Sequence, residues 1–367
     1  MFCQVELDQV IAVHDVTSTY HVPLLLEQQG LINQLRSLFR LQDYPIPQPL
    51  ITKGAKIWKR WTSLTTAQER YLDTEVVRIA LVGKYTNLHD SYLSVIKSLE
   101  HSALAIHKKL DLKWIDASHL EQGTQISNPE AYHDSWSKLC KADGVLVPGG
   151  FGTRGTEGMI AAARWARTKP VPYLGICLGM QIAVIEYARN VLGISTATSE
   201  EFDAQATDKL VMFMPEIDAK TMGGNMRLGL RPTLFQDDSQ WSRLRKLYGG
   251  ASAVNERHRH RYEINPAYIE KLSAAGLPFV GRDDKGERME IVELKDHPWF
   301  VGVQFHPEYL SRVLRPSPPY LGFMAASAGI LEEVTSRRGS VGHAVVNGEG
   351  HGGAINGVAE HLDGVVI

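Results

Sequence analysis

The chain has 367 residues, of which 44% are apolar and 22% charged, and a formal net charge of −2. This composition is typical of a globular protein of about two domains, and the near-neutral charge argues against a nucleic-acid or membrane partner. The cysteines Cys3, Cys140 and Cys177 are widely spaced and odd in number. We therefore expect neither a disulfide framework nor a zinc site, and we expect a cytoplasmic protein without a signal peptide or membrane span.

The first 75 residues differ in pattern from the rest of the chain. An apolar run over residues 10–13 suggests a strand, and an amphipathic helix is expected to reach Phe39. A proline-rich connector over 43–49 precedes a predicted helix over 57–72. We therefore separate residues 1–41 from a linker over 42–75 that contains a helix.

From residue 76 onward, apolar runs alternate with helical patterns. The expected strands are 77–82, 112–115, 144–147 and 171–176, and the expected helices are 90–107, with Asp90 as its cap, 129–142 and 157–168. Strands that alternate with helices predict an α/β fold, in which a parallel or mixed sheet has helices on both faces. Ligands bind such sheets at the carboxyl ends of the strands.

The second half of this region is richer in strands. We expect a turn into a strand over 223–229, a hairpin over 277–294, a buried strand over 299–305 and a last helix over 320–334. The domain is therefore assigned to 76–334. Residues 335–367 are rich in glycine and lack aromatic side chains, which predicts a disordered tail.

Cys177 stands where a predicted strand meets a predicted helix, with Gly175 and Gly179 two residues away on either side. Small neighbours leave a side chain accessible at such a bend, as in a nucleophile elbow. The helix N-terminus would favour the thiolate over the thiol. Taken alone, the motif fits a buried structural cysteine about equally well.

A cysteine nucleophile needs a base and a group that orients the base. His306 follows the predicted strand 299–305, so it can meet Cys177 at one edge of the sheet, and Glu308 lies two residues further. The glycine-rich turn 148–152 could direct N–H groups at an oxyanion. Taken alone, His306 is better explained as a loop histidine, Glu308 also fits a solvated carboxylate at a helix start, and the glycines also fit an ordinary strand-end turn.

Together, three ordered motifs resemble the class I (triad) glutamine amidotransferases. They are Pro-Gly-Gly-Phe-Gly at 148–152, Gly-Ile-Cys-Leu-Gly-Met-Gln at 175–181 and Gln-Phe-His-Pro-Glu at 304–308. Within that family the chain is most similar to the CTP synthases, through 146–158, 222–229 and 256–263. Residues 13–24 resemble the end of the synthetase (amidoligase) domain of those enzymes, so 1–41 is interpreted as its C-terminal remnant.

The resemblance implies a role for each matching residue. Cys177 would attack the side-chain amide of glutamine, His306 would transfer protons and Glu308 would orient His306. Backbone N–H groups of Gly149 and Leu178 would hold the oxyanion. The residues implied in binding glutamine are Gly150, Phe151, Leu178, Gln181, Glu201 and Arg261, with Glu201 facing its ammonium and Arg261 its carboxylate.

The resemblance also implies partners outside this stretch of sequence. A CTP synthase uses ATP, Mg²⁺ and UTP in a synthetase domain with a glycine-rich phosphate loop, responds to GTP as an activator and works as a tetramer. No such loop is found here, so we expect an N-terminally truncated chain that needs no cofactor or metal and keeps only the glutamine-hydrolysing half. A γ-glutamyl hydrolase of the same fold and a non-catalytic fragment or assembly partner remain alternatives.

Overall fold

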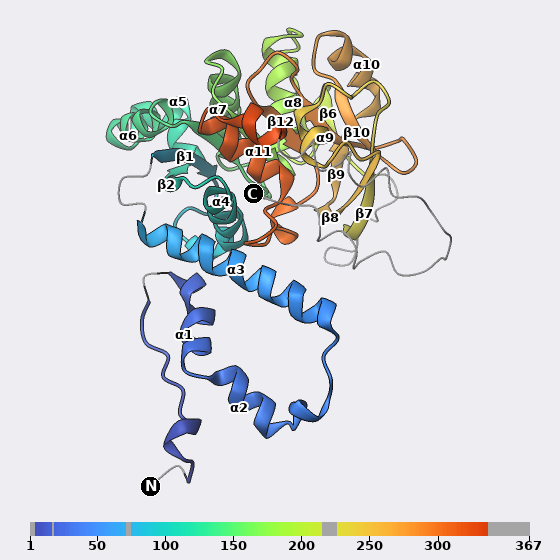
Figure 1. The fold of residues 1–367 in the computed structure, drawn as a ribbon. Coiled ribbons are helices and arrows are strands. Elements are labelled where there is room, and N and C mark those ends of the chain that lie inside the picture. Colours follow the sequence, from blue (N-terminus) through green and yellow to red (C-terminus); the bar gives the residue numbers. More distant parts are fainter. Residues whose placement is uncertain (1–3, 17, 71–74, 215–225, 337–367) are drawn as a thin grey trace. The chain divides into compact units, whose positions relative to one another are not determined.

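The computed structural model describes residues 4–16, 18–70, 75–214 and 226–336 (Figure 1). The chain divides into two compact units, Met1–Thr74 and Glu75–Ile367. Among the described residues, no helix combines the length and the apolar character that crossing a membrane requires.

The first unit is helical. Its elements are η1 (Leu7–Gln9), η2 (Thr19–His21), α1 (Val22–Gln28), α2 (Leu31–Leu38), η3 (Leu41–Asp43) and α3 (Gln48–Arg70). The strand predicted over 10–13 is wrong: these residues form no regular element, and Val10 and Val13 are 56% and 64% exposed. An isolated apolar run without a neighbouring strand cannot satisfy its backbone as a sheet does.

The helices predicted in this unit are confirmed with different bounds. Gly30 has φ +77° and separates α1 from α2, since a left-handed residue interrupts the helix. Helix α3 begins nine residues before the predicted start, at Gln48, because Pro49 is tolerated in a first turn. Of the predicted helix 57–72, the last two residues lie outside the described part of the chain.

The second unit is built on a nine-stranded mixed sheet in the order β2-β1-β3-β4-β12-β11-β10-β7-β8. The first five strands in this order are parallel, and the remaining pairs are antiparallel. In chain order the nine strands are β1 (Val76–Gly83), β2 (Lys109–Asp116), β3 (Gly144–Val147), β4 (Tyr173–Ile176), β7 (Arg227–Phe235), β8 (Ala253–His260), β10 (Phe279–Asp283), β11 (Met289–Glu293) and β12 (Phe300–Val303). A small second sheet contains β5 (Thr198–Ser199), β6 (Lys209–Phe213) and β9 (Tyr262–Ile264).

Helices cover both faces of the large sheet (Figure 1), which confirms the predicted fold class. Alternate residues of each central strand enter different cores, as the two-residue period of a strand requires. Val145 and Val147 pack with α6 (Pro129–Cys140), α7 (Thr156–Thr168) and α8 (Leu178–Asn190), whereas Leu146 packs with α4 (Leu93–Ala105) and α11 (Pro318–Ser327). The remaining helices are η4 (His89–Tyr92), η5 (Ala117–Leu120), α5 (Gln122–Ser127), α9 (Arg243–Leu247), α10 (Pro266–Ala274) and η6 (Pro307–Tyr309).

Two predicted helices differ from the structure by more than a shift of one or two residues at an end. Asp90 lies inside η4, and the residue that precedes α4 is Tyr92, so the prediction that Asp90 caps this helix is wrong. The predicted helix 320–334 is interrupted, because α11 ends at Ser327 and Gly329 has φ +71°. The predicted hairpin is confirmed by the antiparallel pair β10 and β11.

Two predictions fall largely on undescribed residues. Residues 223–225 of the predicted turn lie outside the described part of the chain, and the next strand begins at Arg227. All but the first two residues of the predicted tail 335–367 lie outside it as well.

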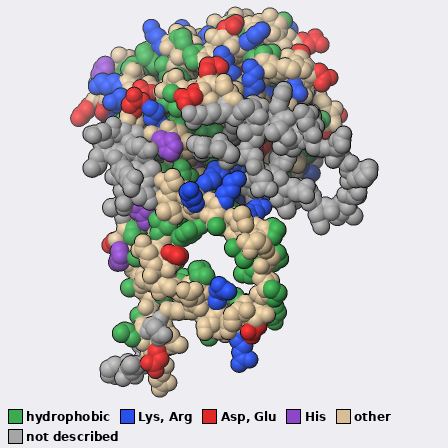
Figure 2. Space-filling view, viewed as in Figure 1, with side chains coloured by type: hydrophobic (Ala, Val, Ile, Leu, Met, Phe, Trp, Pro, Cys, Tyr) green, Lys and Arg blue, Asp and Glu red, His purple; other side chains and the backbone are tan. Residues whose placement is uncertain are grey.

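The two units differ in the side chains they expose. In the upper part of Figure 2, acidic and basic side chains of the second unit are interspersed. The first unit exposes many large apolar side chains, including those of Leu7, Ile32, Leu38, Phe39 and Leu50.

Candidate active site

Cys177 occupies a strained bend between β4 and α8. Its φ is 54° and its ψ −103°, an unusual conformation for a residue with a side chain. A Cβ on Gly175 would lie 2.5 Å from the carbonyl carbon of Gly179, and a Cβ on Gly179 would overlap the carbonyl oxygen of Val147. Both glycines are therefore needed for the close passage of strand and helix, as the elbow motif predicts.

The register of the sheet brings His306 to Cys177. Strands β4 and β12 pair in parallel, with Ile176 opposite Val303, so the residues that come after both strands lie at the same edge. A Cβ on Gly149 would lie 2.9 Å from His306 Cε1 and 3.6 Å from Cys177 Cβ. The structure therefore gathers Cys177, His306 and the turn after β3 in one place.

Glu308 holds the imidazole from its far side. Its Oε1 lies 2.7 Å from His306 Nδ1, and both side chains are buried. Burial of the ring opposes its protonation, but the Glu308 carboxylate and hydrogen bonds with Cys177 and Glu308 outweigh burial and raise the pKa of His306 well above its usual value. The arrangement favours an imidazolium beside the sulfur.

Cys177 Sγ has two further polar neighbours. Gln304 Nε2 donates a hydrogen bond to the sulfur at 3.5 Å, and the backbone oxygen of Arg259 accepts a weak bond from the thiol at 4.0 Å. Leu178 is the first residue of α8, so its N–H has no partner within the helix. This N–H belongs to the residue that directly follows Cys177 in the sequence. The N–H groups of Gln304 and Leu178 are the donors, and they favour negative charge at the sulfur and beside it.

The glycine-rich turn is held from two directions. Lys84, at the end of β1, donates to the backbone oxygens of Phe151 and Gly152. Glu201 Oε1 accepts from the N–H of Gly152 at 2.8 Å. Burial lowers the pKa of Lys84 to about 8. The two side chains fix the turn that carries Gly149 and Gly150.

The other residues implied in glutamine binding differ in how exposed their side chains are. Phe151 is exposed, whereas Gln181 is buried and its Nε2 donates to the backbone oxygen of Tyr262 at 3.2 Å. Burial raises the pKa of Glu201, and the charges of Lys84 and Arg261 act in the opposite direction. Glu201 and Arg261 therefore lie close enough for their charges to interact.

Sequence reasoning gave no role to Lys84 or Gln304. Gln304 could have been found from the two-residue period of a strand, because Gln304 and His306 fall on the same side of an extended segment. Lys84 comes after a buried strand, and its position gives no sign that it would reach the turn after another strand.

Three buried groups could in principle converge on a cation: His258, His260 and Glu290, whose ligand atoms lie within 4.8 Å of one another. However, His258 Nδ1 and His260 Nε2 are hydrogen-bonded at 3.1 Å, and Arg227 Nη2 lies 3.2 Å from Glu290 Oε1. Burial, reinforced by the charge of Arg227, lowers the pKa of His258 to about 2 and that of His260 to about 3. Burial also raises the pKa of Glu290 to about 8, which disfavours its charged form. We assign no metal here, because the guanidinium of Arg227 beside this group repels a cation.

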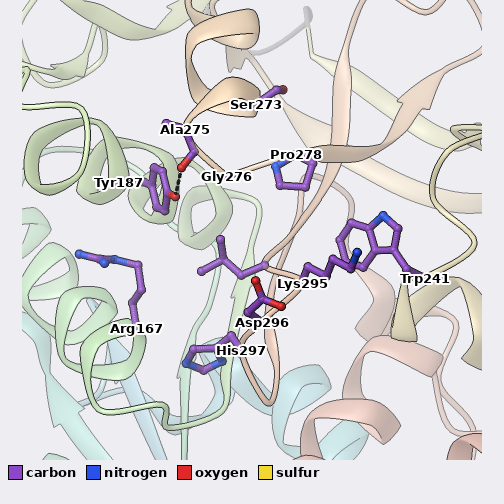
Figure 3. A pocket seen from close by; sticks show the side chains of 11 residues that line it. Arg167, Tyr187, Trp241, Ser273, Ala275, Gly276, Pro278, Lys295, Asp296 and His297 are labelled. Atoms are coloured by element: carbon purple, nitrogen blue, oxygen red, sulfur yellow. Dashed lines mark hydrogen bonds between the residues drawn. The ribbon is translucent and has the colours of Figure 1, made fainter.

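A separate hollow of about 570 Å³ lies beside the segment that leads into β12 (Figure 3). Cys177 comes directly after the end of the parallel strand β4, so the hollow is at the opposite end of these strands. Among its lining residues, Tyr187 donates to the backbone oxygen of Ala275 at 2.7 Å, and Arg167 pairs with Glu186 at 2.8 Å. These polar groups hold the fold together, and we assign the hollow no ligand.

The pKa of His306 leads to a pH prediction. In Glu308→Gln the negative partner is lost, so the imidazolium is less stable and the pKa of His306 falls. Any reaction that needs the protonated ring should then lose its rate at lower pH than in the wild type. We would measure rates between pH 6 and pH 10, about the range in which a perturbed histidine titrates. The fall in rate on the alkaline side should occur at a lower pH in Glu308→Gln than in the wild type. An unmoved limb would contradict the coupling.

Comparisons with known proteins identify relatives for most of the chain. The family model "Glutamine amidotransferase class-I" matches residues 87–326. A CTP synthase of Schizosaccharomyces pombe is 57% identical over 91% of this chain and 55% of its own length, and CTP synthase 1 of Saccharomyces cerevisiae is 54% identical over 91% and 58%. The chain thus spans little more than half the length of these relatives.

One solved structure is similar to about two thirds of this chain. It is described as the glutaminase domain of Trypanosoma brucei CTPS with bound acivicin. It is 43% identical in sequence, superposes with a TM-score of 0.63, and the match covers 69% of this chain and 94% of that one.

Proposed function

Because this chain belongs to the class I glutamine amidotransferases, we propose that it hydrolyses L-glutamine at Cys177 and, as part of a CTP synthase, supplies ammonia for the ATP-dependent amination of UTP. The observation that carries the proposal is the buried row Cys177, His306 and Glu308, with Glu308 Oε1 2.7 Å from His306 Nδ1.

The first half of the reaction forms a thioester. The thiolate of Cys177 attacks the side-chain carbonyl carbon of glutamine, and the N–H groups of Leu178 and Gly149 receive the negative charge that develops on oxygen. His306 donates its proton to the amide nitrogen as the C–N bond breaks, so ammonia leaves neutral. Glu308 keeps the ring oriented throughout.

The second half restores the enzyme. His306, now neutral, accepts a proton from water while the water oxygen attacks the thioester carbon. The C–S bond breaks, the electron pair returns to Cys177, and the new side-chain carboxylic acid loses its proton to solvent as glutamate leaves. The thiolate and imidazolium are thereby regenerated together.

Substrate recognition depends on charge. A free amino acid carries an ammonium and a carboxylate, and Glu201 and Arg261 offer one partner for each as charge-assisted hydrogen bonds. Glu201 also accepts from the N–H of Gly152, so a bound ammonium would be coupled to the turn that holds the oxyanion. Gly150, Phe151 and Gln181 complete the proposed binding surface.

The rest of the proposed activity depends on more than the described residues. The relatives from Schizosaccharomyces pombe and Saccharomyces cerevisiae are CTP synthases. For a full-length enzyme we propose UTP, ATP and Mg²⁺ as ligands, GTP as an activator and a cytoplasmic tetramer as the working form. Residues 1–41 are proposed as the end of its synthetase domain, 42–75 as a linker and 76–334 as the amidotransferase domain.

The test compares glutamine with a γ-glutamyl peptide. We expect the purified chain to release glutamate and ammonia from glutamine, because the proposed Glu201 and Arg261 contacts surround a single free amino acid. Coupled assays for glutamate and for ammonia give both products, and equal amounts are expected.

Faster cleavage of the γ-glutamyl peptide would favour a γ-glutamyl hydrolase instead. No turnover of either substrate would favour a non-catalytic chain. Glu201→Gln serves as the recognition control, and it should raise KM for glutamine more than it lowers kcat.

A further inference from the structure

Two glutamine side chains lie end to end behind the nucleophile. Gln304 is 1% exposed and Gln181 3% exposed. Gln181 Nε2 lies 3.1 Å from Gln304 Oε1, and Gln304 Nε2 lies 3.5 Å from Cys177 Sγ. The two amides therefore form a continuous chain that ends at the reacting sulfur.

The direction of each amide is fixed by a backbone group. The oxygen of Tyr262 can only accept, so the Gln181 atom that faces it at 3.2 Å must be the NH₂ group. The second hydrogen of that NH₂ then points to Gln304, whose facing atom must be its oxygen. The NH₂ group of Gln304 is left facing Cys177, where it can only donate.

Both residues stand on rigid elements. Gln181 lies one turn into α8, and its N–H bonds to the backbone oxygen of Cys177 at 3.2 Å. Gln304 comes directly after β12, and its N–H bonds to the backbone oxygen of Glu290 at 2.9 Å. The donor is therefore preorganised, as a group that stabilises charge must be.

We propose that Gln304 is a catalytic residue that stabilises the Cys177 thiolate, and that Gln181 is a positioning residue that keeps the Gln304 amide turned toward the sulfur. The proposal deepens the proposed glutamine hydrolysis and rests on Cys177 being its nucleophile. A donor to sulfur favours the thiolate over the thioester, because the thiolate is the stronger acceptor. It raises the fraction of Cys177 that can attack and eases departure of the thiolate when water cleaves the thioester.

The test measures alkylation of Cys177 by iodoacetamide against pH, with mass spectrometry of the Cys177 peptide and without glutamine. In Gln304→Glu the side chain keeps its shape and still accepts from Gln181, but an acceptor replaces the donor to sulfur. A hydrogen bond to a charged group is stronger than one between neutral groups, but sulfur is a weak acceptor, so the effect is modest. We therefore expect the pH of half-maximal alkylation to rise by about one unit, which is about tenfold in thiolate population.

We call the chain of contacts from Gln181 through Gln304 to Cys177 the relay. It predicts a second effect, from a substitution that does not touch the sulfur. In Gln181→Glu the new carboxylate can only accept, so the Gln304 amide must turn and present its oxygen to Cys177. The alkylation profile should then shift in the same direction, and combining both substitutions should add little. Gln304→Met, which removes the donor without adding charge, covers the case in which Gln304→Glu does not fold.

Gln125→Glu is the matched control, because Gln125 is exposed on α5. Its profile should match the wild type, with thermal melting used to confirm that each variant is folded. Folded variants at Gln304 that alkylate like the wild type would overturn the role of Gln304, and an unmoved profile in Gln181→Glu would overturn the relay. This readout needs no substrate, so failure of glutamine hydrolysis in the wild type would count against the proposed function separately.

Discussion

His306→Ala is expected to lower kcat for glutamine hydrolysis by about 10²–10⁴-fold, which is the usual contribution of general acid–base catalysis. The loss should lie at the upper end of this range, because the ring also pairs with the Cys177 thiolate and must protonate the departing ammonia. Removing the ring takes away the partner of the thiolate, the acid that protonates ammonia and the base that accepts a proton from water. The measurement is steady-state glutamate release at saturating glutamine.

Glu308→Ala is the informative companion. Glu308 touches the imidazole at 2.7 Å and has no role in bond making, so this variant should keep measurably more activity than His306→Ala. Equal residual activities in two folded variants would contradict the division of roles between the two residues.

Gly179→Ala is expected to damage both stability and activity. A Cβ at this position overlaps the carbonyl oxygen of Val147, so β3 and the start of α8 must separate. Overpacking of this kind costs about 1–3 kcal/mol of the free energy of unfolding, and misplacement of a catalytic group by about 1 Å can cost about 10²-fold in rate. Chemical denaturation and glutamate release measure the two effects.

Gly123→Ala is the control for that substitution. Gly123 lies in the helix α5, where an added Cβ meets no atom within 4 Å. Alanine is the better helix former, so stability should stay constant or rise slightly. If Gly179→Ala behaved in the same way, the close passage at the elbow would not constrain the site.

Much of the sheet could be predicted because its central strands are buried on both faces. The mostly apolar runs at 77–82, interrupted by Arg78, and at 144–147 identify such strands, and the glycines around Cys177 point to a tight bend. Once these strands are placed in parallel, their carboxyl ends bring Cys177, His306 and the turn at 148–152 to one edge. The candidate triad can thus be inferred from short-range patterns and one topological rule.

The remaining features depend on contacts between distant segments. The run at 10–13 has the composition of a strand, but strands need partners, and the local sequence does not reveal that no described segment of the first unit forms one. Lys84 reaches the turn after β3 and Gln304 reaches the sulfur only because of how the strands align. Such contacts are set by register and packing, which a single sequence does not encode locally.

The central claim is that Cys177 is the nucleophile that attacks glutamine. A glutamine-like electrophile such as a diazoketone, offered to the whole chain, tests it most directly, with labelled cysteines identified by mass spectrometry. We predict that Cys177 is labelled stoichiometrically and that glutamine protects it. Cys140 is exposed but lies outside the candidate site, so it should stay unlabelled. Cys3 should also stay unlabelled. Equal labelling of all three cysteines, or labelling of Cys177 that glutamine does not slow, would contradict the account.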